Sequence, residues 1–309
     1  MVFTKEFDLL LIKFPIYLPI LYGLLIYIFP SYDLLVAFIF LMLLAEPHFG
    51  ATWPFLFNKV NKPMIKSEKF YFIYSPILIS ITALISYIYA SSLFFLIFFL
   101  INVYHVTKQS VGISKLYLKK DSMESVIQEY SIYIANIILF IIAIGKFYLG
   151  IINEGNIIYI NIILLILFFV FLIFYINKFG FSENILQAIT GIIIFSPICF
   201  VDKPIHAIVM GVSMHYIQYI ALTYKVEKER RNQIENKAVK FNLNFIFIII
   251  FYGAIMAVLS LSNNLNHEIF KHLLFIPLLG QLLHFYLDGF LWRFSEPHHR
   301  NNTLKHLKA

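Results

Sequence analysis

The stretch at residues 157–176, IIYINIILLILFFVFLIFYI, runs for twenty residues without a charged side chain. An α-helix rises about 1.5 Å per residue, so this length reaches across the roughly 30 Å hydrocarbon core of a bilayer. Asn161 is its one side-chain amide. The stretch therefore predicts a membrane-spanning helix.

Nine further apolar runs repeat this pattern, and the chain as a whole is 60% hydrophobic and 13% charged. A soluble domain carries roughly 25% charged residues, so a soluble globular protein is excluded. We expect an all-α, polytopic membrane bundle forming a single domain over residues 1–309. The ten expected spans are residues 14–29, 33–57, 70–90, 93–116, 126–149, 157–176, 185–201, 205–224, 245–261 and 269–292.

The basic residues gather in short clusters between the apolar runs, which gives the chain a formal net charge of +7. Cytoplasmic loops of membrane proteins are enriched in Lys and Arg, so the clusters predict that both termini are cytoplasmic. Topology thus accounts for the charge, and no nucleic-acid partner is expected. The lone cysteine, Cys199, excludes a disulfide framework. We expect a multi-pass protein of a bacterial inner membrane, in contact with its lipids.

Strongly polar side chains inside a span are costly, so each one marks a candidate site. They fall on the second, fourth, eighth and tenth expected spans. These residues are Glu46, His48, His105, Lys108, Gln109, His215, Gln218, Gln281, His284 and Asp288.

The four histidines of this set share a depth. All lie on even-numbered spans, which run in the same direction, and each comes about 10 to 15 residues, or roughly 15 to 23 Å, from the outer end. Separate helices have little reason to place histidines at one level unless these converge on a common object. A transition-metal ion is the simplest such object, because neutral imidazole suits iron, zinc, copper and nickel. The predicted ligands are His48, His105, His215 and His284.

Each predicted ligand has a polar neighbour that could orient it. Residues three or four apart share a helix face, and a metal-bound histidine usually donates its second N–H to such a group. Glu46 is the candidate for His48, although two residues do not span a helix turn. The others expected to support the site are Gln109, Gln218, Tyr219 and Asp288.

An all-imidazole site without thiolates argues against structural zinc and against a carboxylate-bridged di-iron centre. Fe(2+) is therefore the expected metal, with up to two positions left for dioxygen and a substrate. A site at membrane depth is reached by a lipid-soluble molecule. The sequence predicts an enzyme, a membrane-bound non-haem iron oxygenase.

The segment Pro47-His48-Phe49-Gly50-Ala51 is similar to the Pro-His-Gly-Ala segment of the membrane beta-carotene 15,15'-dioxygenases of the Brp/Blh type. His105, His215 and His284, with an acid at Asp288, extend the resemblance. It implies an all-helical fold in which these four histidines hold one iron(II) and beta-carotene is split by dioxygen into two retinals. Two departures stand out. Tyr219 replaces the family's second late histidine, and Val-Thr-Lys-Gln follows His105 where the family has Phe-Gly. We therefore expect a carotenoid, an isoprenoid or a fatty lipid as substrate.

Three alternatives remain open. Glu46, His48 and Asp288 could form the relay of a proton- or ion-coupled transporter. A membrane lipid hydroxylase or desaturase is the second alternative, although its clustered histidine boxes are absent. A purely structural scaffold is the third, and it leaves the common depth of the histidines unexplained. Outside the spans, His298-His299 in a charged segment is a candidate for a second metal.

Overall fold

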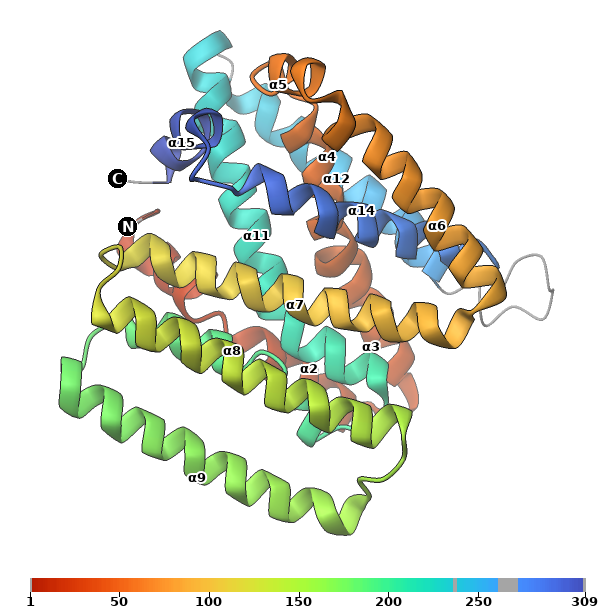
Figure 1. The fold of residues 1–309 in the computed structure, drawn as a ribbon, viewed down its shortest axis with the longest axis vertical. Helices are drawn as coiled ribbons and strands as arrows, with labels where there is room; N and C mark the ends of the chain where they lie inside the picture. Colours follow the sequence, from red (N-terminus) through yellow and green to blue (C-terminus); the bar gives the residue numbers. More distant parts are fainter. Residues whose placement is uncertain (1, 236–237, 261–271, 308–309) are drawn as a thin grey trace. The chain divides into compact units, whose positions relative to one another are not determined.

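The fold is given by a computed structural model that describes residues 2–235, 238–260 and 272–307. All regular secondary structure in these ranges is helical (Figure 1), which confirms the all-α prediction. The expected outer loop at residues 262–268 lies outside the described ranges, as do the first residues of the expected span 269–292.

The chain divides into two compact units. The first contains residues 1–2, 34–102 and 216–309, and the second contains residues 3–33 and 103–215. Three helices contribute residues to both units: α3 (Asp33–Phe40) through Asp33 alone, α7 (Ser91–Tyr117) and α11 (Pro204–Glu235). The single-domain organisation expected from the sequence stays a prediction.

In the first unit, α12 packs along α4 and α14 packs against α4 and α6 (Figure 1). Glycine allows the close approach of α4 and α12, because a Cβ at Gly50 would meet the ring of Tyr252 at 2.7 Å. The other helices of this unit include two short ones that follow α4 and α14. The bounds are α3 Asp33–Phe40, α4 Glu46–Leu56, α5 Lys62–Ser67, α6 Ser75–Tyr89, α12 Ala238–Ser260, α14 Phe275–Leu291 and α15 Pro297–Asn302.

In the second unit, α8 packs against α10, where Asn136 donates a hydrogen bond to the carbonyl of Gly191 at 3.1 Å. Helix α9 lies along α8 (Figure 1), and the Tyr175 hydroxyl of α9 is bonded to Gln128 of α8. The bounds are α1 Lys5–Phe7, α2 Tyr17–Ile28, α8 Met123–Ala143, α9 Glu154–Phe179 and α10 Ile185–Ile193.

Seven helices in the described part of the chain are long and apolar enough to cross a membrane. They are Pro30–Leu56, Phe70–Tyr89, Ser91–Tyr117, Met123–Tyr148, Gly155–Phe179, Pro204–Asn232 and His272–Leu291. The pair Lys5–Lys13 and Tyr17–Ile28, bent by 56°, would make an eighth. The multi-pass membrane class is thus supported by length and composition.

The remaining expected spans look different in the structure. The expected span 185–201 is not one long helix, because α10 ends at Ile193 and a 3₁₀ turn follows over Ser196–Cys199. The expected span 245–261 corresponds to a shorter apolar helix, Asn244–Ser260. Ten spans and the cytoplasmic placement of both termini therefore stay predictions.

Two of the long spans contain a π-helical segment directly before a proline. Leu41–Ala45 precedes Pro47, and Phe70–Tyr74 precedes Pro76. Proline lacks an N–H, and its ring clashes with the carbonyl four residues earlier in a regular α-helix. The wider π turn supplies room for the ring. The span through Pro47 therefore continues into α4, which carries His48.

Gly253 of α12 packs directly on this π turn. A Cβ at Gly253 would lie 2.6 Å from the carbonyl oxygen of Met42 and 2.7 Å from the ring of Pro47. Because a backbone atom is in the way, we expect Gly253→Ala to lower the free energy of unfolding by about 1–3 kcal/mol. Thermal unfolding in detergent measures the change. Gly112→Ala is the control, since a Cβ there meets nothing within 4 Å; equal loss of stability in both variants would contradict the packing argument.

The C-terminal segment after α14 is tied to α11 by what we call the tail latch, formed by Glu227, Arg230, Asn302 and Thr303. Arg230 donates hydrogen bonds to the Glu227 carboxylate at 2.7 Å, to the Asn302 carbonyl at 2.8 Å and to the Thr303 hydroxyl at 2.8 Å. The Arg230 and Glu227 side chains are only 3% and 2% exposed. A buried ion pair with all these partners fixes the segment in place.

His299 makes the stability of this segment depend on pH. Burial lowers its pKa to about 4, with further lowering by the positive charges of His298, Arg230 and Arg293. An unfolded histidine titrates near 6.5, so between these values the unfolded chain binds the additional proton. We expect stability to be full above about pH 6.5 and to fall by up to about 3 kcal/mol as the pH drops to about 4. Unfolding midpoints across this range measure the slope, and His299→Gln should flatten it.

The second-metal alternative for His298 and His299 remains untested. Their rings meet edge to face with centroids 5.2 Å apart, and Nε2 of His298 donates to Asn61 Oδ1 at 3.0 Å. Asn302 Nδ2 lies 3.5 Å from Nδ1 of the same ring, so both ring nitrogens of His298 already have hydrogen-bond partners.

Candidate metal centre

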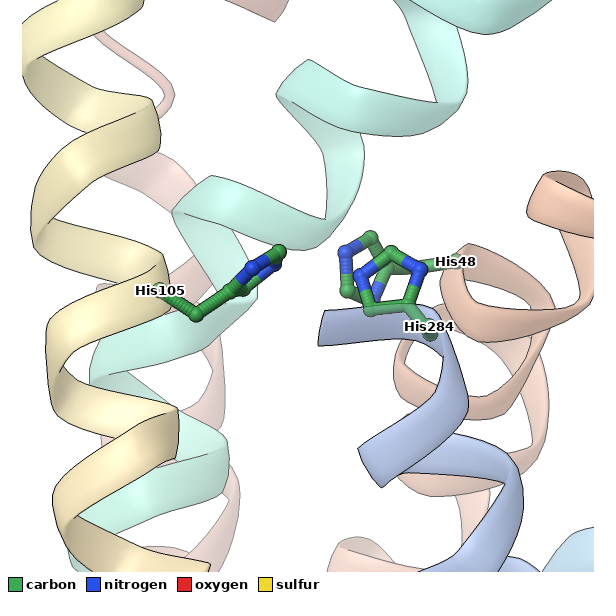
Figure 2. A group of neighbouring side chains, drawn as sticks. All are labelled: His48, His105 and His284. Atoms are coloured by element: carbon green, nitrogen blue, oxygen red, sulfur yellow. The ribbon is translucent and has the colours of Figure 1, made fainter. Parts of the chain in front are cut away.

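The first unit brings together two of the four predicted ligands. His48 on α4 and His284 on α14 are 1% and 0% exposed, and their ring centroids lie 4.4 Å apart at an interplanar angle of 71° (Figure 2). Their positions follow from helix register. His48 is in the first turn of α4 after the π segment, and His284 is in the middle of α14. Two imidazoles from separate helices thus meet inside the unit.

A chain of hydroxyl groups adjoins this pair. His284 Nδ1 lies 2.6 Å from Thr52 Oγ1, which lies 2.9 Å from the Tyr219 hydroxyl. The Tyr219 hydroxyl donates to Asp288 Oδ1 at 2.7 Å. The Tyr219 ring also packs on both imidazoles, with centroids 4.7 Å from His48 and 5.1 Å from His284. We call His284, Thr52, Tyr219 and Asp288 the hydroxyl relay.

With Asp288 ionised, the relay assigns the proton of His284 to one of its two ring nitrogens. An ionised carboxylate only accepts, and each hydroxyl has one proton to donate. The Tyr219 proton goes to Asp288, so the Thr52 proton must go to Tyr219. Thr52 then accepts from His284, which places the proton on Nδ1. Nε2 of His284 is left with its lone pair, as a metal ligand requires.

Tyr219 and Asp288 were singled out from the sequence as supporting residues, and both lie in the relay. Asp288 Oδ2 is also 3.6 Å from His284 Nε2, on the facing position that their spacing predicts. Thr52 was missed. It lies four residues after His48 on the same face of α4, and this spacing is the signal that could have found it.

Glu46 hydrogen bonds with α14 in the structure. Gln281 Nε2 donates to Glu46 Oε1 at 3.1 Å, and the Glu46 side chain is fully buried. Its second oxygen, Oε2, has no hydrogen-bond partner among the described residues. Two buried carboxyl groups therefore lie on the helices that carry the histidine pair, Glu46 on α4 and Asp288 on α14.

The second unit holds the other two predicted ligands as a pair of their own. His105 on α7 and His215 on α11 are 6% and 0% exposed, with ring centroids 5.7 Å apart at 84°. His105 is also drawn in Figure 2. Gln109, one turn after His105, is half-buried, whereas Gln218, on the part of α11 in the first unit, is buried. The structure thus arranges the four histidines as two edge-to-face pairs.

No protein-family model, no curated protein and no solved structure matches this chain. The chemistry of the site must therefore be argued from its donors. Imidazole nitrogens buried among carboxyl and hydroxyl groups bind divalent transition metals well, because coordination compensates for the lost hydration.

Proposed function

We propose that this chain is an integral membrane non-haem iron oxygenase in which His48, His105, His215 and His284 hold one Fe(2+). The observation that carries the proposal is the hydroxyl relay, which leaves Nε2 of His284 unprotonated beside the ring of His48. A neutral Nε2 with a free lone pair is the form of imidazole that binds a metal ion.

The second histidine pair is included through helix α11. His215 precedes Tyr219 by four residues on this continuous helix, or about 6 Å along its axis. Tyr219 packs on His48 and His284, so α11 carries both one histidine of the second pair and a residue that contacts the first pair. In the proposal, His105 and His215 bind the same ion as His48 and His284.

The charge of the first unit also favours a divalent cation. Glu46 and Asp288 are buried carboxyl groups, and four neutral imidazoles add no charge to the ion. Iron(II) is proposed because neutral nitrogen donors without thiolate suit it, and because bound iron supplies the redox chemistry needed to activate dioxygen.

The surroundings of the histidines suit a hydrophobic substrate. The ring of Phe49 lies 5.1 Å from that of His284, and the ring of Tyr216 lies 5.2 Å from that of His48. Phe285 adds a third aromatic ring, 5.7 Å from His284. Such rings exclude water and offer apolar contact area. We therefore propose a carotenoid, an isoprenoid or a fatty lipid as substrate, with dioxygen as co-substrate.

Metal analysis of the full chain, purified in detergent after growth with added iron, tests the proposal. We expect about one iron per chain in the wild type and less than a tenth of that in His48→Ala, His105→Ala, His215→Ala and His284→Ala. His272→Ala is the matched control, because His272 is exposed, and it should keep its iron. A folded wild-type protein without metal, or four variants that keep wild-type iron, would refute the iron site.

The masses of the products formed by the iron-loaded protein then distinguish the possible reactions. Cleavage by a dioxygenase gives two carbonyl fragments that contain both oxygen atoms. A hydroxylase adds one oxygen, and a desaturase removes two hydrogens. The lipid hydroxylase or desaturase alternative is therefore decided by the product.

A transporter remains the second candidate, and the fully buried Glu46 favours it. It predicts proton-coupled uptake in liposomes that Glu46→Gln abolishes. Proton-coupled uptake by the metal-free protein that Glu46→Gln abolishes would refute the oxygenase proposal and favour a transporter.

A further inference from the structure

A pocket of about 400 Å³ opens in the second unit, where α2 ends and α11 begins. Its volume is within the usual range for small-molecule sites. Both apolar and ionisable residues line the pocket. The apolar residues include Ile26, Tyr27, Phe200 and Met210, and the ionisable residues are Asp33, Asp202, Lys203 and His206.

The Asp33 carboxylate in the pocket lining is held in place by two neighbouring side chains. His206 Nε2 donates to Asp33 Oδ2 at 3.0 Å, and Lys203 forms an ion pair with the same oxygen. Because the proton of His206 is on Nε2, its Nδ1 accepts from the Tyr22 hydroxyl at 2.6 Å. Tyr22 and His206 are 0% and 4% exposed. The carboxylate is therefore positioned by a buried network before any ligand arrives.

The rim carries accessible charges of both signs. The Lys203 side chain is 57% exposed and the Asp202 side chain is 85% exposed. Asp202 lies 3.3 Å from the ammonium of Lys146, which also donates to the carbonyl of Val201 at 2.7 Å. The pocket thus offers one accessible ammonium and two carboxylates, which complements a ligand with both a phosphate and an ammonium group.

The apolar residues that line the pocket indicate that this ligand has a hydrophobic part. Tyr27 and Phe200 are 83% and 70% exposed at the mouth of the pocket. In a membrane protein, aromatic residues at the ends of spans lie at the level of the lipid head groups. A soluble phosphate compound would leave these side chains without a partner.

We propose that this pocket binds phosphatidylethanolamine. Its phosphate would pair with Lys203, its ammonium would lie between Asp33 and Asp202, and its glycerol and acyl chains would follow Phe200 and Met210. Choline head groups lack N–H donors for the two carboxylates, and glycerol head groups lack the positive charge. The site is separate from the proposed metal centre and does not depend on it.

Lipid analysis of the full chain in nanodiscs tests this assignment. Nanodiscs are prepared with equal amounts of phosphatidylethanolamine, phosphatidylcholine and phosphatidylglycerol. The protein is then released from the nanodiscs, and the lipids that stay bound to it are measured by native mass spectrometry. We expect at least about fivefold enrichment of phosphatidylethanolamine on the wild type. Equal retention of the three lipids, or preference for another, would overturn the proposal.

Variants place the binding in the pocket. Lys203→Ala and Asp202→Asn should each lose the enrichment, and Asp202→Asn alters a side chain that is 85% exposed and keeps its size. Lys178→Ala, at the exposed end of α9, should keep it. Enrichment that persists in both pocket variants would overturn the assignment. So would full competition by water-soluble glycerophosphoethanolamine at equal concentration, because the ligand would then be the soluble head group.

Discussion

Tyr219→Phe is expected to weaken metal binding by about 10- to 100-fold, the usual effect of removing a group that orients a ligand. Without the Tyr219 hydroxyl, the Thr52 hydroxyl loses the oxygen that accepts its hydrogen bond. It then donates its proton to His284 Nδ1 instead. The proton of His284 then moves to Nε2 and blocks the ligand nitrogen. Titration of the metal-free protein with Fe(2+) against a competing chelator measures the affinity.

Two control variants separate this effect from loss of packing. Tyr216→Phe removes a hydroxyl from a ring that also packs on His48 but lies outside the relay, and it should stay close to wild type. Thr52→Ser keeps the hydroxyl and should do the same. If Tyr219→Phe binds metal as tightly as Tyr216→Phe, the tautomer argument is wrong.

Arg230→Met is expected to lower the free energy of unfolding by about 3–5 kcal/mol, because it leaves the buried carboxylate of Glu227 without its charge partner. Asn58 would remain as a donor to Glu227, at 2.7 Å, but it is neutral. Chemical unfolding in detergent measures the loss, and proteolysis should show the C-terminal segment released first.

The double variant Arg230→Met with Glu227→Leu provides the internal test. Removing both charges takes away the unpaired carboxylate, so most of the stability should return. Arg300→Met is the matched control, because Arg300 is exposed and bonds only to nearby carbonyls. A single variant no less stable than Arg300→Met would show that the tail latch contributes little.

The helical membrane class could be predicted from the sequence because it depends on average polarity over long windows. The helix count could not, since hydropathy measures apolar length and not the continuity of a helix. Residues 185–201 are apolar throughout most of their length, yet α10 ends at Ile193 and Pro197 lies in a separate turn.

The candidate site was predictable where one helix decides the geometry. Spacing along α14 indicated that Asp288 faces His284, and rarity of charge in the spans drew attention to Glu46. Contacts between helices could not be predicted from the sequence. Thr52 is an ordinary residue in an apolar helix, and its place between His284 and Tyr219 depends on how three helices pack.

The π turn at Leu41–Ala45 makes this segment of the chain sensitive to the deletion of a single residue. A π turn contains one residue more than an α turn of the same hydrogen-bonded ladder. Deleting a single codon within residues 41–45 would convert it into an α turn, with the flanking helix segments kept in nearly the same register. The same deletion would bring the ring of Pro47 against a carbonyl. Single-codon deletions here should therefore be far more damaging than conservative substitutions at the same positions.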